Sequence, residues 1–136
     1  SERERRAKKG FLAQTGENAV RQITSHVLDL SVGRPAAGVP LSLFKLDAID
    51  QSKVTETIGR GVTNEDGRAT DLVETNIVLE KGSYKLHFNL SSYFKGRGIK
   101  IFFPSADIIF VIEGTGEHYH IPLLLSPFGY STYRGS

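Results

Sequence analysis

The sequence contains no cysteine among its 136 residues. Disulfide bonds, cysteine nucleophiles and thiolate metal sites are therefore excluded. It also lacks any apolar run near the roughly 20 residues that a membrane-spanning helix needs. The net charge of +2 is too small to indicate a nucleic-acid partner. No G-x-G-x-x-G, P-loop or EF-hand pattern occurs, so the common motifs for nucleotides and calcium are absent as well.

What the sequence does contain is typical of one globular domain. Apolar residues make up 39% of the chain and charged residues 24%, a balance that favours folding over disorder. The length suits a single domain with a core of its own. The first residues, SERERRAKKG, are mostly charged. We therefore predict that residues 1–22 form a charged extension or linker and that residues 23–136 form the domain.

Short stretches with the composition of β-strands follow from residue 23 onward. They are ITSHVLDL, LSLFKLD, KVTETIGRGV, ATDLVE, SYKLHFNL, DIIFVIEG and two more near the end of the chain. Turn signals such as Asp66-Gly67 separate them. A single helix is predicted in SSYFKGRG, with a serine as its N-cap and a glycine at its end. Seven or eight short strands with one helix predict an all-β fold, an antiparallel β-sandwich.

The clearest candidates for chemistry are His118 and His120, which flank Tyr119. On a strand, the period of two sends both imidazoles to one face and the tyrosine to the other. Such a pair can present two metal ligands, although the sequence offers no obvious carboxylates beside it. An imidazole that titrates near neutrality can equally act as an acid or a base. Both histidines can also be ordinary hydrogen-bonded residues, and the pattern alone leaves all three interpretations open.

Pro122 and the three leucines that follow it suggest a partner. A proline cannot donate a hydrogen bond to a neighbouring strand, so we expect this strand at a sheet edge or with a bulge. The leucines at positions 123–125 need burial. A second subunit often covers an apolar segment near a sheet edge, so the pattern favours oligomerisation.

Three further residues gain interest only in combination. His26 lies among strand-forming residues and shares a face with Thr24, while Arg68 directly follows the predicted turn. An arginine at a strand start can hold a planar anion or a carbonyl group by paired hydrogen bonds. Ser136 adds a hydroxyl to a polar but strand-like ending. A Ser–His–Asp hydrolase is rejected, because no G-x-S-x-G elbow is present and no acid is placed by the sequence.

Taken together, these segments resemble one family. They are ITSHVLDLSVGRPAAGVPLSLFKLD, TNEDGR, GSYKLHFNLSSYF, FFPSADIIFVI and HYHIPLLLSPFGYSTYRGS. From Ile23 to Ser136 the chain is similar to the transthyretin-related 5-hydroxyisourate hydrolases. The ending Y-R-G-S is the most specific part. Transthyretin itself, a hormone carrier of the same fold, lacks this ending and the paired histidines, so the resemblance favours the enzyme.

The resemblance implies a transthyretin-like (prealbumin-like) β-sandwich of two four-stranded sheets with one short helix. It implies a homotetramer, a dimer of dimers, whose active sites lie in a central channel. The implied reaction belongs to purine metabolism and urate degradation. In it, 5-hydroxyisourate, the product of urate oxidation, is hydrolysed to 2-oxo-4-hydroxy-4-carboxy-5-ureidoimidazoline without a cofactor or a metal. The alternative is a transthyretin-type carrier of small aromatic ligands in the same channel.

The family's motif residues also carry over to this chain. The resemblance implies four catalytic residues, which are His26, Arg68, His120 and Ser136. Three further residues complete the signature and are expected to bind substrate, namely Tyr133, Arg134 and Gly135. The family motif gives His118 no catalytic part, so a structural or interface role is expected for it.

Residues 1–22 have no counterpart in the shortest family members. In plants a similar hydrolase domain follows a decarboxylase domain that performs the next step. The extension therefore suits a fusion to, or a partnership with, such a decarboxylase as well as it suits a simple extension. The ending Arg-Gly-Ser is not a peroxisomal S-K-L signal, so a cytoplasmic location is expected, with the peroxisome as the alternative. Neither nucleic acid nor membrane is expected as a partner.

Overall fold

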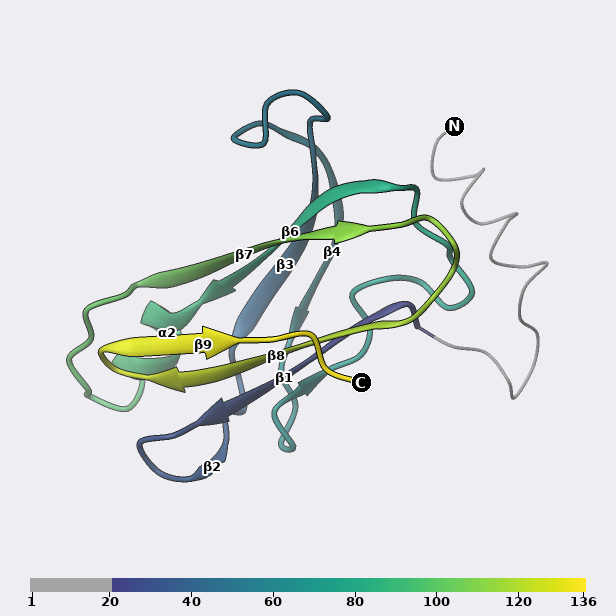
Figure 1. The fold of residues 1–136 in the computed structure, drawn as a ribbon. Coiled ribbons are helices and arrows are strands. Elements are labelled where there is room, and N and C mark those ends of the chain that lie inside the picture. The colour runs from purple at the N-terminus through teal and green to yellow at the C-terminus, as the bar shows by residue number, and fades with distance from the viewer. Residues whose placement is uncertain (1–20) are drawn as a thin grey trace.

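The computed structural model describes residues 21–136, so residues 1–20 of the predicted extension lie outside the described residues. Two β-sheets face each other across one core (Figure 1). Sheet A comprises β1 (Ile23–Asp29), β2 (Arg34–Pro35), β5 (Arg68–Ala69), β8 (Tyr119–Ser126) and β9 (Gly129–Thr132). Sheet B comprises β3 (Pro40–Leu46), β4 (Val54–Val62), β6 (Gly82–Asn89) and β7 (Ser105–Ile112).

Within residues 21–136 the predicted sandwich with one short helix is confirmed, but it differs from the prediction in two respects. Sheet A has the order β2-β1-β8-β9, and β5 also pairs with β1, so this sheet has five strands rather than four. Sheet B has the order β4-β3-β6-β7, as four antiparallel strands. The pairing of β1 with β8 is parallel, whereas an antiparallel arrangement was expected throughout. Strand β1, at the start of the domain, and strand β8, near its end, therefore lie side by side.

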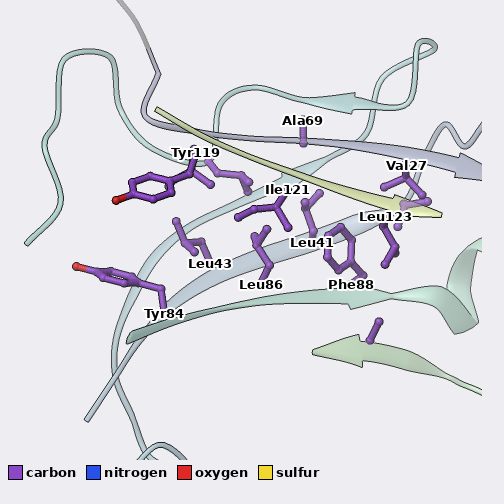
Figure 2. Packing of buried hydrophobic residues seen from close by; sticks show 14 of the residues in the cluster. Val27, Leu41, Leu43, Ala69, Tyr84, Leu86, Phe88, Tyr119, Ile121 and Leu123 are labelled. Atoms are coloured by element: carbon purple, nitrogen blue, oxygen red, sulfur yellow. The ribbon is translucent and has the colours of Figure 1, made fainter. Parts of the chain in front are cut away.

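Alternation along the strands builds the core between the sheets. On β1 every second residue is buried, and the residues between them are half-buried. Ile121 and Leu123 of sheet A meet Leu41, Leu86 and Phe88 of sheet B at the centre (Figure 2). Burying one such side chain contributes about 1.5–3 kcal/mol. The core therefore decides which face of each strand points inward and which face is left for a site.

The predicted helix is α2 (Leu90–Lys95), but its cap differs from the expected serine. The side-chain oxygen of Asn89 accepts a hydrogen bond from the backbone N–H of Ser92 at 3.1 Å. The Tyr93 hydroxyl donates to the buried carboxylate of Asp29 at 2.7 Å, which ties the helix to sheet A. Burial and this carboxylate raise the pKa of Tyr93 to about 12. No helix within residues 21–136 is long and apolar enough to cross a membrane.

The strand predicted in ATDLVE is largely wrong. Only Ala69 of this stretch lies in a strand, and residues 70–74 have none. Leu72 and Val73 lie in a bend and are both buried in the core, whereas the alternation of a strand with one face toward the core would bury only one of them. The segment also packs closely on β4, because a Cβ on Gly59 would lie 1.9 Å from the carbonyl oxygen of Leu72. Core packing therefore overrides the local strand pattern here.

The sequence predicts a sheet edge or a bulge at Pro122, and the structure has neither. Strand β8 is an inner strand, with β1 on one side and β9 on the other. The pairing with β9 ends at Leu123↔Thr132 and returns as a single bridge between His120 and Gly135. The interruption faces Pro122, which has no N–H to donate. The Thr132 hydroxyl instead donates to the Pro122 carbonyl oxygen at 2.7 Å.

Candidate active site

The outer face of sheet A carries two of the predicted catalytic residues at its centre. In the parallel pair of β1 and β8, Thr24 lies opposite His120 and His26 lies opposite Pro122. The alternate residues of both strands fill the core, so Thr24, His26 and His120 point to the outer face. All three are half-buried. The register therefore brings residues from the two ends of the domain onto one patch.

A tight turn places Arg68 beside His26. The side-chain oxygen of Asn64 accepts a hydrogen bond from the backbone N–H of Arg68 at 3.0 Å. Gly67 has a φ of +75°, and a Cβ there would lie 2.5 Å from the carbonyl oxygen of Val27, so only glycine fits. Strand β5 then pairs with β1 so that Arg68 lies opposite His26. Among residues 21–136, the guanidinium of Arg68 has no ion-pair partner.

The last residues return along β8 and reach His120. The backbone N–H of Gly135 donates to the carbonyl oxygen of His120 at 2.7 Å. The imidazole covers this glycine, because a Cβ on Gly135 would lie 2.6 Å from Cδ2 of the ring. Ser136 is the next residue and is exposed. The four residues predicted to be catalytic therefore all lie on or beside the outer face of β1 and β8.

The other two residues of the ending line a different place. Tyr133 and Arg134 border a mostly apolar cavity of about 310 Å³ between β7 and β8. The guanidinium of Arg134 lies 4.6 Å from the centre of the Tyr119 ring and donates to the carboxylate of Glu117 at 3.2 Å. These contacts fasten the ending to the start of β8. Substrate binding by Tyr133, Arg134 and Gly135 stays a prediction.

His118 and His120 share one hydroxyl group. Oγ1 of Thr24 lies 2.8 Å from Nδ1 of His120 and 3.2 Å from Nε2 of His118. The other nitrogen of His118, Nδ1, lies 2.9 Å from the carbonyl oxygen of Arg21. The rings are stacked, with centroids 6.5 Å apart, which confirms that both lie on one face. In the described part of the chain, no group of three or more side chains could hold a metal ion.

The surroundings of His120 favour its neutral form. Burial lowers the pKa of His120 below the ordinary histidine value of 6.5, the charge of Arg68 lowers it further, and His118 and His26 would do the same whenever they carry a proton charge. A cation beside an imidazole makes a second positive charge unfavourable. At neutral pH the ring is therefore uncharged and can accept a proton. A neutral imidazole near a guanidinium can activate water beside a carbonyl group that the guanidinium holds.

Sequence reasoning missed residues that position the site. It placed Thr24 on the face of His26, but contact with His120 depends on the register of β1 against β8. Asn64 was not singled out, although an asparagine two to four residues before a glycine turn is a signal for side-chain bonds to the backbone. Gly67 was read only as part of a turn, whereas it also allows the close approach to β1.

Comparisons with known proteins agree on one family. The family model described as "HIUase/Transthyretin family" matches residues 23–135. A 5-hydroxyisourate hydrolase of Halalkalibacterium halodurans is 41% identical over 119 residues, which cover 85% of this chain and 98% of the relative. The solved structure of Klebsiella pneumoniae 5-hydroxyisourate hydrolase has a TM-score of 0.71 and 37% identity, covering 84% of this chain and 97% of that one. Sea bream transthyretin in complex with thyroxine has a TM-score of 0.73 and 30% identity, covering 84% and 94%. The transthyretin-like fold is thereby confirmed.

The packing of His120 on Gly135 leads to a first prediction. In Gly135→Ala the new methyl group clashes with the imidazole, so the ring or the ending must move. We expect altered His120 ring resonances in NMR spectra and a loss of about 1–3 kcal/mol in the free energy of unfolding, as for other overpacked sites. The control is Gly129→Ala, where the nearest atom is 3.8 Å away. Unchanged His120 resonances in Gly135→Ala would show that the ring does not rest on the glycine.

The charges around His120 lead to a second prediction. Arg68 lowers the pKa of His120, so Arg68→Gln is expected to raise that pKa. Because burial is the largest cause and remains, the value should stay below 6.5. An NMR titration of the His120 ring measures this directly. Arg60→Gln on sheet B should leave the His120 titration unchanged, and a fall in the pKa upon Arg68→Gln contradicts the geometry.

Proposed function

This chain belongs to the HIUase/transthyretin family, and we propose that it is a 5-hydroxyisourate hydrolase. The enzyme opens a ring C–N bond of 5-hydroxyisourate and yields 2-oxo-4-hydroxy-4-carboxy-5-ureidoimidazoline. This step belongs to urate degradation within purine metabolism. Relatives that carry the hydrolase name cover most of the chain, which favours hydrolysis over the transport of a small aromatic ligand.

One observation carries the proposal more than any other. His26, Arg68 and His120 come from three strands that are separated in sequence, and strand pairing brings them to one patch. The bridge of Gly135 to His120 then adds Ser136 to the same patch. A merely structural sheet face has no need for two half-buried imidazoles and a guanidinium without an ion-pair partner among residues 21–136. The arrangement suits a small planar substrate rich in carbonyl groups.

In the proposed mechanism His120 acts as the general base. Its neutral Nε2 takes a proton from a water molecule, whose oxygen adds to the ring carbonyl carbon of the substrate. The C–N bond of the resulting tetrahedral intermediate then breaks. The proton returns from His120 to the leaving nitrogen, so the histidine ends in the form in which it began. The lowered pKa of His120 keeps this neutral form available at pH values where an ordinary histidine is partly protonated.

Arg68 supplies the positive charge that the intermediate needs. Its guanidinium would hold the carbonyl oxygen by paired hydrogen bonds and stabilise the negative charge that develops on it. His26, opposite Arg68 on β1, would orient the substrate or the water. Ser136 would orient the substrate or relay a proton through its hydroxyl. Removing one such stabilising donor from an enzyme typically costs about 10²–10³ in rate.

The alternative is a carrier of small aromatic ligands, and one comparison structure does hold thyroxine. The polar patch argues against it in this chain, because two imidazoles and a guanidinium leave little apolar surface for a hormone. Tight binding of thyroxine together with the absence of hydrolysis would be the result that revives it.

A third prediction tests the hydrolase directly. Purified protein is mixed with freshly generated 5-hydroxyisourate, and the decay of its ultraviolet absorbance is followed. The decay should be much faster than the spontaneous reaction, and His120→Gln should lose about 10²–10⁴-fold in kcat, the range of general base catalysis.

A matched control is His87→Gln. This histidine lies on the outer face of sheet B, where its Nδ1 pairs with Asp107 at 2.6 Å. It should keep wild-type turnover. Wild-type decay at the spontaneous rate would overturn the proposed function, whereas normal turnover by His120→Gln would remove only that residue from the mechanism.

We also propose that the chain assembles as a homotetramer, a dimer of dimers. Strands β7 and β9 are sheet edges, and edges of this kind readily pair with another chain. Ile109 and Val111 of β7 are 49% and 56% exposed, although both are large and apolar. A second pair of subunits over sheet A would enclose the histidine patch and exclude water, which strengthens its electrostatic contacts. The decarboxylase partner and the compartment stay predictions.

Light scattering after size exclusion gives the fourth prediction. The wild type should elute with the mass of four chains, and Ile109→Lys should reduce this to smaller species, because a charge is placed on the edge that pairs. Val54→Lys, on the opposite edge of sheet B, is the control and should keep the wild-type mass. A monomeric wild type at micromolar concentration contradicts the assembly.

A further inference from the structure

A continuous chain of hydrogen bonds runs from the backbone to His120. It starts at the carbonyl oxygen of Arg21, which lies 2.9 Å from Nδ1 of His118. Nε2 of His118 lies 3.2 Å from Oγ1 of Thr24, and that oxygen lies 2.8 Å from Nδ1 of His120. Four groups are therefore linked in order, and each link constrains where the next proton sits.

The donor and acceptor of each hydrogen bond in this series follow from the first group, the carbonyl oxygen of Arg21. A backbone carbonyl can only accept, so Nδ1 of His118 must carry the proton. In a neutral His118 the other nitrogen, Nε2, then has a free lone pair and accepts the hydroxyl proton of Thr24. The hydroxyl has only one proton to give, so its oxygen must accept from His120. Nδ1 of His120 therefore carries the proton of the neutral ring.

We propose that Thr24 and His118 are positioning residues that hold neutral His120 in the tautomer whose Nε2 is free to accept a proton. The kinetic part of this inference rests on the proposed function, in which His120 is the general base. The tautomer itself does not depend on that function. Neither residue needs to touch the substrate, since both act through the Nδ1 side of the ring.

If neutral His120 carried its proton on Nε2 instead, the hydrogen bonds of Thr24 would have to run in the opposite direction. Thr24 would then donate to Nδ1 of His120 and would need a proton from Nε2 of His118. Because Nδ1 of His118 already carries one, His118 would have to be a cation. That cation would stand beside His120, on which the positive charge of Arg68 already acts. Positive charges so close to one another are unfavourable, so the arrangement with neutral His118 and neutral His120 is favoured.

The same series of hydrogen bonds can stay intact while His120 gains and loses a proton. When His120 takes a proton on Nε2, its Nδ1 proton still points to Thr24, and no hydrogen bond has to break. Thr24 is well suited to hold this geometry, because a β-branched side chain has few χ1 states. The parallel register fixes its distance to His120, as the two residues lie opposite each other on β1 and β8. The pairing of β1 with β8, and not a loop, therefore determines the contact between Thr24 and His120.

The fifth prediction reads the tautomer in the intact protein. Two-bond 1H–15N NMR spectra of uniformly labelled protein separate protonated from unprotonated ring nitrogens. At a pH where His120 is neutral, its Nδ1 should be protonated and its Nε2 unprotonated. Thr24→Val, which removes only the hydroxyl, should shift the ring toward a mixture of both tautomers. Thr24→Ser should restore the wild-type spectrum, and Thr57→Val on sheet B should not change it.

Kinetics form the second arm. Thr24→Val should lower kcat about tenfold, which is less than the 10²–10⁴-fold that loss of the general base itself costs, with KM nearly unchanged. Thr24→Ser should recover most of this loss, and a loss of activity through altered folding would not be rescued in this way. A wild-type His120 protonated at Nε2 overturns the inference, and so does a Thr24→Val variant with wild-type kcat. A wild type that shows the expected tautomer but no hydrolysis overturns the proposed function instead.

Discussion

The parallel pairing of β1 with β8 is the constraint on which the rest of the structure depends. One register sends Val27 and Leu123 into the core and leaves His26 and His120 on the outer face. A slip by one residue would exchange these faces and drive two imidazoles into the core. The apolar residues therefore fix the site as firmly as they fix the fold. Thr24 gains its contact with His120 only because this register places the two side by side.

Two shorter segments complete the patch because they are fastened to that strand pair. The turn before β5 holds Arg68 through Asn64 and fits against β1 only with a glycine at position 67. The ending returns beside β8 and is fastened by Arg134, which contacts both Glu117 and the ring of Tyr119. Gly135 then lies under the imidazole of His120. Arg134 and Gly135 therefore act as positioning residues, which hold Ser136 and the His120 ring in place.

Much of the fold could be predicted because alternation along a strand is a local property. The strands that became β1, β6 and β7 were found in this way, and so was the short helix. The pattern failed at Leu72 and Val73, where the core buries two consecutive residues. It failed again at Pro122, which an inner strand accommodates at a gap in its ladder. Both errors concern tertiary packing, which a local pattern does not contain.

The site was less accessible to such reasoning, since the candidate residues drew attention singly and were joined only by the family resemblance. What the resemblance could not supply is the register that links Thr24 to both histidines. If the outer face of β1 and β8 binds the substrate, a crystal structure with urate, the purine precursor of the substrate, will show it there. We expect the urate ring within hydrogen-bonding distance of the Arg68 guanidinium and of Nε2 of His120. Urate found instead in the cavity beside Tyr133, with the histidine patch empty, would contradict it.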